Sequence, residues 1–248
     1  MTDTLVVDVS RDWASACDVQ QGFMHSTLPT GHGISYAARC RQLRALGGDC
    51  YDFLSLPHNR VAFTIGDASG KSLPAALMIA NVQSSLRTAA FFVGNEHAAV
   101  LSAVNRQFHT ASLDDRFATL FYGVFDTSTH LLHYANAGHN PPLVIRRDGS
   151  VDWLDIGGLP LGLFTESTYE EDGIYLQPGD TVIAYTDGVV EAVNPLGEEW
   201  GAEGIQKAAS QNKTNDSDEL LDAIFASLDG FTKGRQTDDA SIVVLLAH

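Results

Sequence analysis

Basic side chains are scarce in this sequence. Its 248 residues include 15 lysines and arginines against 31 aspartates and glutamates, which gives a net charge of −16. Such a chain repels nucleic acid and anionic membranes, so we expect neither as a partner. Acidity can serve solubility alone. The remaining question is whether some of the acids converge on cations.

Long apolar runs and leader segments are also missing. No stretch of the sequence approaches the roughly 18 consecutive apolar residues that a bilayer-spanning helix needs. The N-terminus, MTDTLVVDVSRDW, lacks the basic region and long apolar stretch of a secretory signal. We therefore expect a cytoplasmic protein. The 44% hydrophobic and 19% charged residues are ordinary for a soluble globular domain.

Cysteine and histidine patterns that would hold zinc are not found. Cys17, Cys40 and Cys50 are odd in number and match no zinc-motif spacing, which predicts reduced thiols in a cytosolic protein. His130 and His133 stand three apart in HLLHYAN, which has the composition of a strand. Residues at that spacing on a strand point to opposite faces. We therefore expect ordinary strand residues rather than a ligand pair.

The first half of the chain predicts a helix, strands and two more helices. A loosely helical pattern covers residues 10–25, and LPTGHG breaks it. Strand-like runs follow in ISYAARCRQ and in CYDFLSLPHNRVAFTIGD, which has the pattern of a hairpin turning at 57–59. Ser72 can then cap a helix with Pro74 in its first turn, and a second helix is expected over 96–111.

The second half predicts a block of strands, a helix and a last strand. Strand-like composition runs from 117 to about 186, and Asp216 with Glu219 suits a capping box for a helix near 216–228. The final ASIVVLLA is a continuous apolar run, typical of a central buried strand. This order lacks βαβ alternation and predicts an α+β domain of mainly antiparallel sheets covered by helices. We expect that domain over 28–248, after an N-terminal extension of 1–27.

Aspartates recur at the ends of the expected strands. They lie in four segments: Gly47-Gly48-Asp49, Gly66-Asp67-Ala68-Ser69-Gly70, Thr186-Asp187-Gly188 and Asp238-Asp239. Glycine lets the backbone turn sharply and lets another group approach closely. A single Asp-Gly pair is more often a turn or a cap. Four such segments at the ends of adjacent strands would surround one small volume.

Such a gathering of acids requires compensation. Two unit charges about 4 Å apart repel by about 4 kcal/mol at an effective dielectric constant of about 20. Several such pairs would threaten a fold whose total stability is on the order of 5–15 kcal/mol. Protonation, basic partners or cations could compensate, and basic partners are few here. Divalent cations with carboxylate and carbonyl ligands are the natural answer.

Eight motifs follow one another from about residue 18 to residue 247. They are VQQGFMHSTLP, LGGDCYDFLSL, AFTIGDASGKSLPAALMIANVQSSLR, FATLFYGVFD, LLHYANAGHNPPLVI, GGLPLGL, LQPGDTVIAYTDGVVEA and QTDDASIVVLL. Together they resemble the PPM (type-2C-like) Ser/Thr protein phosphatases, in the bacterial SpoIIE/RsbU-like branch. The resemblance implies an αββα sandwich, with two antiparallel sheets flanked by helices. This agrees with the order of elements above.

The resemblance also implies a site for two divalent cations, Mn²⁺ or Mg²⁺. Asp67 matches the family residue that bridges both metals, and the carbonyl of Ala68 is an expected ligand. Asp187 and Asp238 are expected to hold one metal, and Asp49 the other, directly or through water. Asp239 occupies a neighbouring position that is often Asn in the wider family, so its place is in the metal shell or just outside it.

The implied reaction is direct attack on phosphorus by a hydroxide that bridges the two metals. No Cys-x5-Arg loop is present, which argues against the cysteine-based phosphatases. Eukaryotic members carry a proposed general-acid His where this chain has Ser69, and no equivalent of their phosphate-binding arginine stands out. Ser69, Gly70 and Lys71 are candidates to lie near the phosphate. For His139 and Asn140, in AGHNPP, turn geometry is favoured over catalysis.

In this branch the typical substrate is a phosphorylated STAS-domain anti-anti-sigma factor. The resemblance thus implies such a protein as the partner, with phosphoserine or phosphothreonine as the group hydrolysed. The helix expected at 10–25 matches the segment that joins sensor and phosphatase in relatives, and we hypothesise that it mediates homodimerisation or switching. Two alternatives stay open: a non-catalytic interaction module with a degenerate phosphatase fold, and a metal-dependent phosphoesterase for small phosphate esters.

Overall fold

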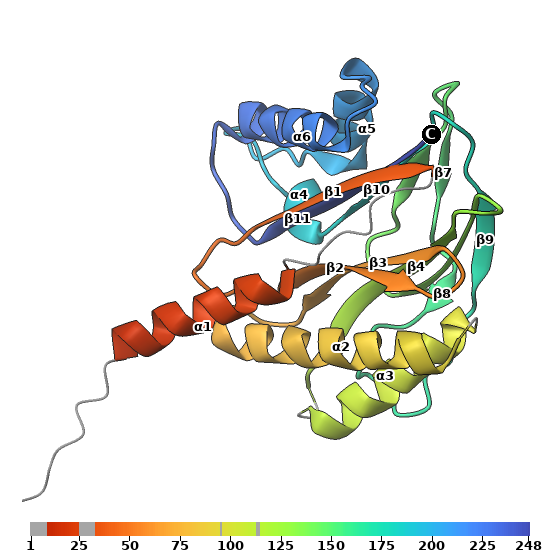
Figure 1. The fold of residues 1–248 in the computed structure, drawn as a ribbon. Helices are drawn as coiled ribbons and strands as arrows, with labels where there is room; N and C mark the ends of the chain where they lie inside the picture. The colour runs from red at the N-terminus through yellow and green to blue at the C-terminus, as the bar shows by residue number, and fades with distance from the viewer. Residues whose placement is uncertain (1–8, 25–32, 95, 113–114) are drawn as a thin grey trace, which may run out of the picture.

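The computed structural model describes residues 9–24, 33–94, 96–112 and 115–248. Two β-sheets lie face to face, and helices cover both outer faces (Figure 1). Almost all strand pairs are antiparallel; the short β5–β8 pair is parallel. The expected αββα sandwich is therefore confirmed.

The first sheet joins strands that are distant in the sequence, whereas the second is built mainly from consecutive strands. The first has the order β1 (Ile34–Arg41), β11 (Ala240–Ala247), β10 (Thr181–Tyr185), β6 (Leu143–Ile145) and β7 (Val151–Trp153). The second has the order β2 (Asp49–Leu56), β3 (Arg60–Ala68), β4 (Ala118–Asp126), β5 (Leu131–Ala137) and β8 (Gly157–Gly158). The strand β9 (Asp172–Tyr175) pairs with β5.

The helices divide between the two outer faces. The pair α2 (Leu73–Phe92) and α3 (His97–Ala111) packs on the second sheet, and α5 (Gly201–Gln211) and α6 (Ser217–Thr232) pack on the first (Figure 1). The short α4 (Asp187–Val190) follows β10, and α1 (Val9–Met24) contacts β2 and α2 at its C-terminal end (Figure 1). In the described part of the chain, no helix combines the length and apolarity needed to cross a membrane.

Alternating side chains of the strands fill separate layers of core. On β3, Val61, Phe63 and Ile65 lie between the sheets, whereas Ala62 and Ala68 face α2 and α3. Every residue of β11 is buried, because helices cover one face and the other sheet covers the second. Burial of each large apolar side chain contributes about 1.5–3 kcal/mol. The continuous apolar run at the C-terminus is thus the central strand that the sequence predicted.

Several local predictions are confirmed and others are wrong. The hairpin turn after Leu56 and the helix at 9–24 are present. Asp216 caps α6 by accepting from the amides of Asp218 and Glu219, but the Glu219 carboxylate accepts from Thr214 Oγ1 instead of closing a capping box. Ser72 holds the N-cap position of α2 without any side-chain cap hydrogen bond. The predicted boundary at 27/28 lies outside the described residues.

Two further differences concern a histidine and a helix. His130 is not a strand residue as predicted: it occupies a turn before β5, with φ of 58°. His133 does lie on β5, where its ring stacks on His97 at 5.1 Å. Helix α5 was not predicted, because its sequence GAEGIQKAASQ holds few large apolar residues and two glycines. All three cysteines are unpaired, as expected.

Candidate active site

Antiparallel pairing brings the four aspartate segments to one end of the sandwich. Asp49 begins β2 and pairs in register with Asp67, near the end of β3. Asp187 follows β10, and Asp238 and Asp239 precede β11, the antiparallel neighbour of β10. In an antiparallel pair, the C-terminal end of one strand lies beside the N-terminal end of its neighbour, so these residues lie close together.

The five aspartates line one cavity of about 460 Å³, which we call the acidic cavity. The other lining residues are Ser69, Gly70, Lys71, Phe117, Thr119, His139 and Asn140. The expectation that distant acids surround one small volume is thus met. Of the predicted site residues, only Ala68 is not among those that line the cavity.

The glycines of these segments make the close approach of the loops geometrically feasible. A Cβ on Gly48 would lie 2.8 Å from Asp67 Oδ1 and 2.9 Å from the carbonyl oxygen of Ala68. A Cβ on Gly188 would lie only 1.9 Å from the carbonyl oxygen of Asp239. Real Cβ atoms do not tolerate such distances, so these two positions require glycine for space. The Ala68 carbonyl therefore lies beside Asp67, although it does not line the cavity.

Burial, and next to it mutual repulsion, raises the pKa values of four aspartates of the cavity. The pKa of Asp67 rises from 3.8 to about 7, through burial first and then the charges of Asp187, Asp238 and Asp239. Burial and the charge of Asp67 raise the pKa of Asp49 well above its ordinary value. The pKa values of Asp187 and Asp239 are also raised, chiefly by burial. Burial and neighbouring carboxylates thus both disfavour the charged form of these acids.

Three of the carboxylates already accept hydrogen bonds from protein donors. Asp49 Oδ2 accepts from Thr186 Oγ1 at 2.8 Å and from Ser241 Oγ at 2.7 Å. Asp239 accepts from the amides of Leu43 and Gly48, at 2.7 and 3.0 Å. Asp238 forms an ion pair with Lys71 at 2.6 Å. These bonds fix the loops around the cavity.

The carboxylates of the aspartates and the carbonyl of Ala68 are oxygen ligands of the kind that hard divalent cations prefer. Within residues 9–24, 33–94, 96–112 and 115–248, no group of three or more His, Cys, Asp or Glu side chains is arranged to hold a metal ion as it stands. Two of the carboxylates, Asp238 and Asp239, are bonded to Lys71 and to backbone amides respectively. Burial first, and then neighbouring carboxylates, raise the pKa values of Asp67 and Asp187, and a carboxylate-binding cation would offset both effects.

Two features of the acidic cavity were not predicted: His139 and Asn140 line it, and Arg116 lies close to it. His139 Nδ1 lies 2.8 Å from Thr119 Oγ1, and burial lowers the pKa of His139 to about 4. The His139 amide donates to Asn136, and this bond supports the predicted turn role even though His139 and Asn140 also line the cavity. A Cβ on Gly70 would lie 3.2 Å from Arg116 Nη1, so this arginine borders the predicted phosphate region. No sequence pattern connects Arg116 with Gly70.

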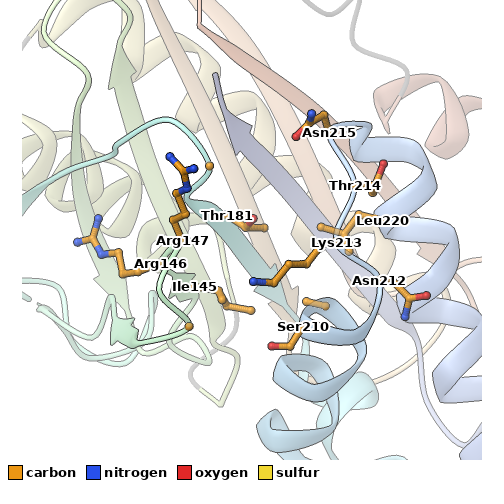
Figure 2. A pocket seen from close by; sticks show the side chains of 13 residues that line it. Ile145, Arg146, Arg147, Thr181, Ser210, Asn212, Lys213, Thr214, Asn215 and Leu220 are labelled. Carbon is orange, nitrogen blue, oxygen red and sulfur yellow. The ribbon is translucent and has the colours of Figure 1, made fainter.

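A second cavity, of about 560 Å³, has the opposite character and is called the basic cavity. It lies between the β6–β7 hairpin, the start of β10 and the connection from α5 to α6 (Figure 2). Lys213 extends toward the β6 side, where Arg146 and Arg147 lie (Figure 2). No aspartate or glutamate is among its described lining residues. It is therefore unsuited to cations.

Comparison with known proteins identifies the family to which the chain is similar. Residues 57–248 match the family model described as Stage II sporulation protein E (SpoIIE). Protein IcfG of Synechocystis is 30% identical over 254 residues, which cover 92% of this chain and 40% of IcfG. Phosphoserine phosphatase RsbU of Bacillus subtilis is 26% identical over 239 residues, covering 96% of this chain and 70% of RsbU. This chain thus spans well under half of IcfG.

Solved structures share the fold at lower identity. The SiaA-PP2C domain of Pseudomonas aeruginosa superposes with a TM-score of 0.83 at 19% identity and covers 97% of each chain. The catalytic domain of the serine/threonine phosphatase PstP, solved with two manganese ions, gives a TM-score of 0.63 at 17% identity and covers 87% of this chain and 100% of its own. At these identities the likeness shows the fold alone.

Proposed function

Since this chain belongs to the SpoIIE family of PP2C-type phosphatase domains, we propose that it hydrolyses phosphoserine or phosphothreonine in a reaction that needs divalent cations at the acidic cavity. The observation that carries the proposal is the convergence of five aspartates from four segments on one cavity. For Asp49, Asp67, Asp187 and Asp239, burial first and then neighbouring carboxylates raise the pKa, as is common for carboxylates at functional sites.

The aspartates divide the work of holding two cations, Mn²⁺ or Mg²⁺. Asp67 is central, because its carboxylate interacts with the charges of the other acids and it pairs in register with Asp49. Asp187 and Asp238 would bind from the first sheet, and Asp49 and the Ala68 carbonyl from the second. Bound there, the cations supply a water of lowered pKa as nucleophile and offset charge on the phosphoryl oxygens. Asp239 positions the Gly48 loop through the two amides that it binds.

Two basic residues would orient the phosphate: Lys71, which lines the acidic cavity, and Arg116, which lies beside Gly70. Lys71 lines the cavity and holds Asp238, and a phosphate or cation that competes for either partner would release the other. Arg116 borders Gly70 and supplies the guanidinium that the sequence motifs did not reveal. A planar guanidinium matches two phosphate oxygens. Neutral His139 holds Thr119 in place rather than adding charge.

We also propose the substrate and the assembly. The substrate would be a phosphorylated STAS-domain anti-anti-sigma factor, in keeping with the branch to which the motifs belong. The extension of 1–27 would act as a dimerisation or switching segment before the phosphatase domain of 28–248. On α1, the side chains of Trp13, Val19 and Phe23 are 36%, 58% and 45% exposed, which leaves apolar surface for a second copy.

Hydrolysis assays separate this function from its alternatives. The purified chain is assayed with p-nitrophenyl phosphate and with a phosphorylated STAS protein, with and without Mn²⁺ or Mg²⁺. We expect metal-dependent release of phosphate from both. Release from p-nitrophenyl phosphate alone would favour a phosphoesterase for small esters. No release with any metal would favour a non-catalytic module.

A further inference from the structure

Helix α1 reaches the acidic cavity through one buried glutamine. Gln20 is 7% exposed, and its side chain contacts both polar groups of Gly47. Its Nε2 donates to the Gly47 carbonyl at 2.8 Å, and its Oε1 accepts from the Gly47 amide at 3.2 Å. Gln42 Nε2 donates to the same Oε1 at 2.9 Å. The glutamine thus binds the first residue of the Gly47-Gly48-Asp49 segment on both sides.

The clamped segment is also bound on its cavity side. The Gly48 amide donates to Asp239 Oδ2 at 3.0 Å, and the Gly48 carbonyl accepts from the Ala68 amide at 3.1 Å. A Cβ on Gly47 would lie 2.3 Å from Asp239 Oδ2, so the loop and this carboxylate are packed without slack. Movement at Gly47 would therefore move Gly48 and the acids that surround it.

Glutamine suits this clamp for a chemical reason. Its planar amide carries a donor and an acceptor, so one side chain can satisfy the N–H and the C=O of a single residue. A leucine of similar size offers neither group, and a glutamate offers only acceptors when ionised. Buried backbone groups left without partners favour conformations in which they reach other partners or water.

We propose that Gln20 is a positioning residue of the acidic cavity, which fixes the Gly47-Gly48-Asp49 segment so that Asp49 and Asp239 stay in place for cation binding. The expected effect on cation binding rests on the proposed function, whereas the role of Gln20 in fixing the segment does not. Helix α1 is then a mechanical support of the cavity and not only an apolar surface. Outer-shell partners of this kind typically change metal affinity 10–100-fold when lost.

The experiment compares two buried glutamines that join α1 to the body of the protein. Gln83, on α2, is 5% exposed and donates from Nε2 to the Phe23 carbonyl at 2.9 Å. Gln83→Leu therefore loosens α1 without removing the clamp on Gly47, whereas Gln20→Leu removes the clamp. The first measurement is amide hydrogen exchange at Leu43 and Gly48 in the metal-free full chain. The second is the affinity for Mn²⁺ by calorimetry.

Gln20→Leu is expected to accelerate exchange at both amides at least about tenfold and to weaken Mn²⁺ binding about tenfold or more. Gln83→Leu is expected to stay within about twofold of the original chain in both measurements. Unchanged exchange in Gln20→Leu, or an equal effect of Gln83→Leu, would overturn the proposal.

A second variant covers the case in which Gln20→Leu does not fold. Gln20→Glu keeps an acceptor for the Gly47 amide and loses the donor to its carbonyl, so we expect faster exchange at Gly48 here too. Unchanged exchange would count against the clamp. Exchange is measured without metal or substrate, so its result decides the role of Gln20 even if no phosphatase activity exists. Absence of activity in the original chain would instead end the proposed function.

Discussion

The two cavities at the ends of strand β10 are lined by side chains of opposite charge. Its first residue, Thr181, lines the basic cavity, and Asp187, just past its last residue, lines the acidic cavity. At the basic end, Arg146 is paired with Asp152 and Asp180, both at 2.6 Å, whereas Lys213 has no ion pair among the described residues. At the acidic end, five aspartates line the cavity, and Lys71, the one lysine among the lining residues, forms an ion pair with Asp238. With one basic partner for five aspartates, the acidic cavity is the end of β10 at which we propose that cations bind.

The largest effect is expected from Asp67→Asn. This change removes the carboxylate proposed to bind both cations, so we expect Mn²⁺-dependent hydrolysis to fall at least about 100-fold, because losing even an outer-shell partner costs about 10–100-fold. The metal-free protein is expected to gain stability at pH 8, because the burial of a charge and the repulsion that raise the pKa of Asp67 are both removed. Kinetics and thermal unfolding in EDTA measure both.

The control for Asp67→Asn lies at the other end of β10. Asp180→Asn removes an acid that is bonded to Arg146 at 2.6 Å, and it is expected to lower stability and leave Mn²⁺ dependence unchanged. If Asp67→Asn kept full activity, or lowered stability as Asp180→Asn does, the acidic cavity would be an ordinary structural cluster.

The second prediction concerns pH. The pKa of Asp67 in the folded protein, about 7, exceeds its ordinary 3.8. The folded state therefore holds this proton more tightly than the unfolded chain, and the resulting stabilisation is fully present below about pH 4 and lost as pH rises through 7. Metal-free protein is expected to lose stability over this range, which denaturant unfolding at several pH values will show.

Cation binding is expected to respond to pH in the opposite direction. Protons compete with Mn²⁺ for the same carboxylate, so the apparent affinity is expected to rise by about tenfold from pH 6 to pH 8. Calorimetry at fixed ionic strength measures this. An affinity that is constant with pH, or that falls, would place Mn²⁺ binding away from Asp67. In Asp67→Asn, both pH dependences are expected to be weaker.

The sequence predicted the convergence of the acids because strand ends and Asp-Gly pairs are local signals. Once Asp49, Asp67 and Asp187 are assigned to strand ends, antiparallel pairing brings them together. The clamp of Gln20 on Gly47 joins residues 27 apart through a side chain, and no periodicity encodes that contact. Arg116 beside Gly70 was missed for the same reason. Long-range side-chain contacts depend on packing angles, which a hydrophobic pattern does not specify.

The third prediction compares two lysines, one in each cavity. Lys71→Met removes the cation bonded to Asp238, so the metal-free protein is expected to lose stability and KM for the phosphorylated substrate to rise several-fold. Lys213→Met at the basic cavity is expected to change neither, since Lys213 makes no ion pair among the described residues. Steady-state kinetics and unfolding curves test both. Equal effects of the two changes would mean that Lys71 acts only through net charge.

The smallest expected effect comes from backbone strain, which also differs between the two ends. Ser72, next to Lys71, has φ of 64° and ψ of −142°, a conformation that favours glycine, and its side chain makes no cap hydrogen bond in return. Gly149, which lines the basic cavity, has φ of 90° and open space where a Cβ would lie. The strained non-glycine residue is thus found at the acidic end, as is common near functional sites.

Two reciprocal substitutions measure this difference. Ser72→Gly is expected to stabilise the protein by about 1 kcal/mol, because relief of roughly 1–3 kcal/mol of strain exceeds the entropy that glycine adds to the unfolded chain. Gly149→Ser is expected to destabilise it by about 1 kcal/mol, since no contact except the backbone conformation opposes the new side chain. For a chain of this size each change shifts Tm by about 2–4 °C, in opposite directions. If Ser72→Gly instead lowered the stability, the serine side chain would stabilise the folded protein by more than the backbone strain costs. Ser72 would then hold the loop at Lys71 in place.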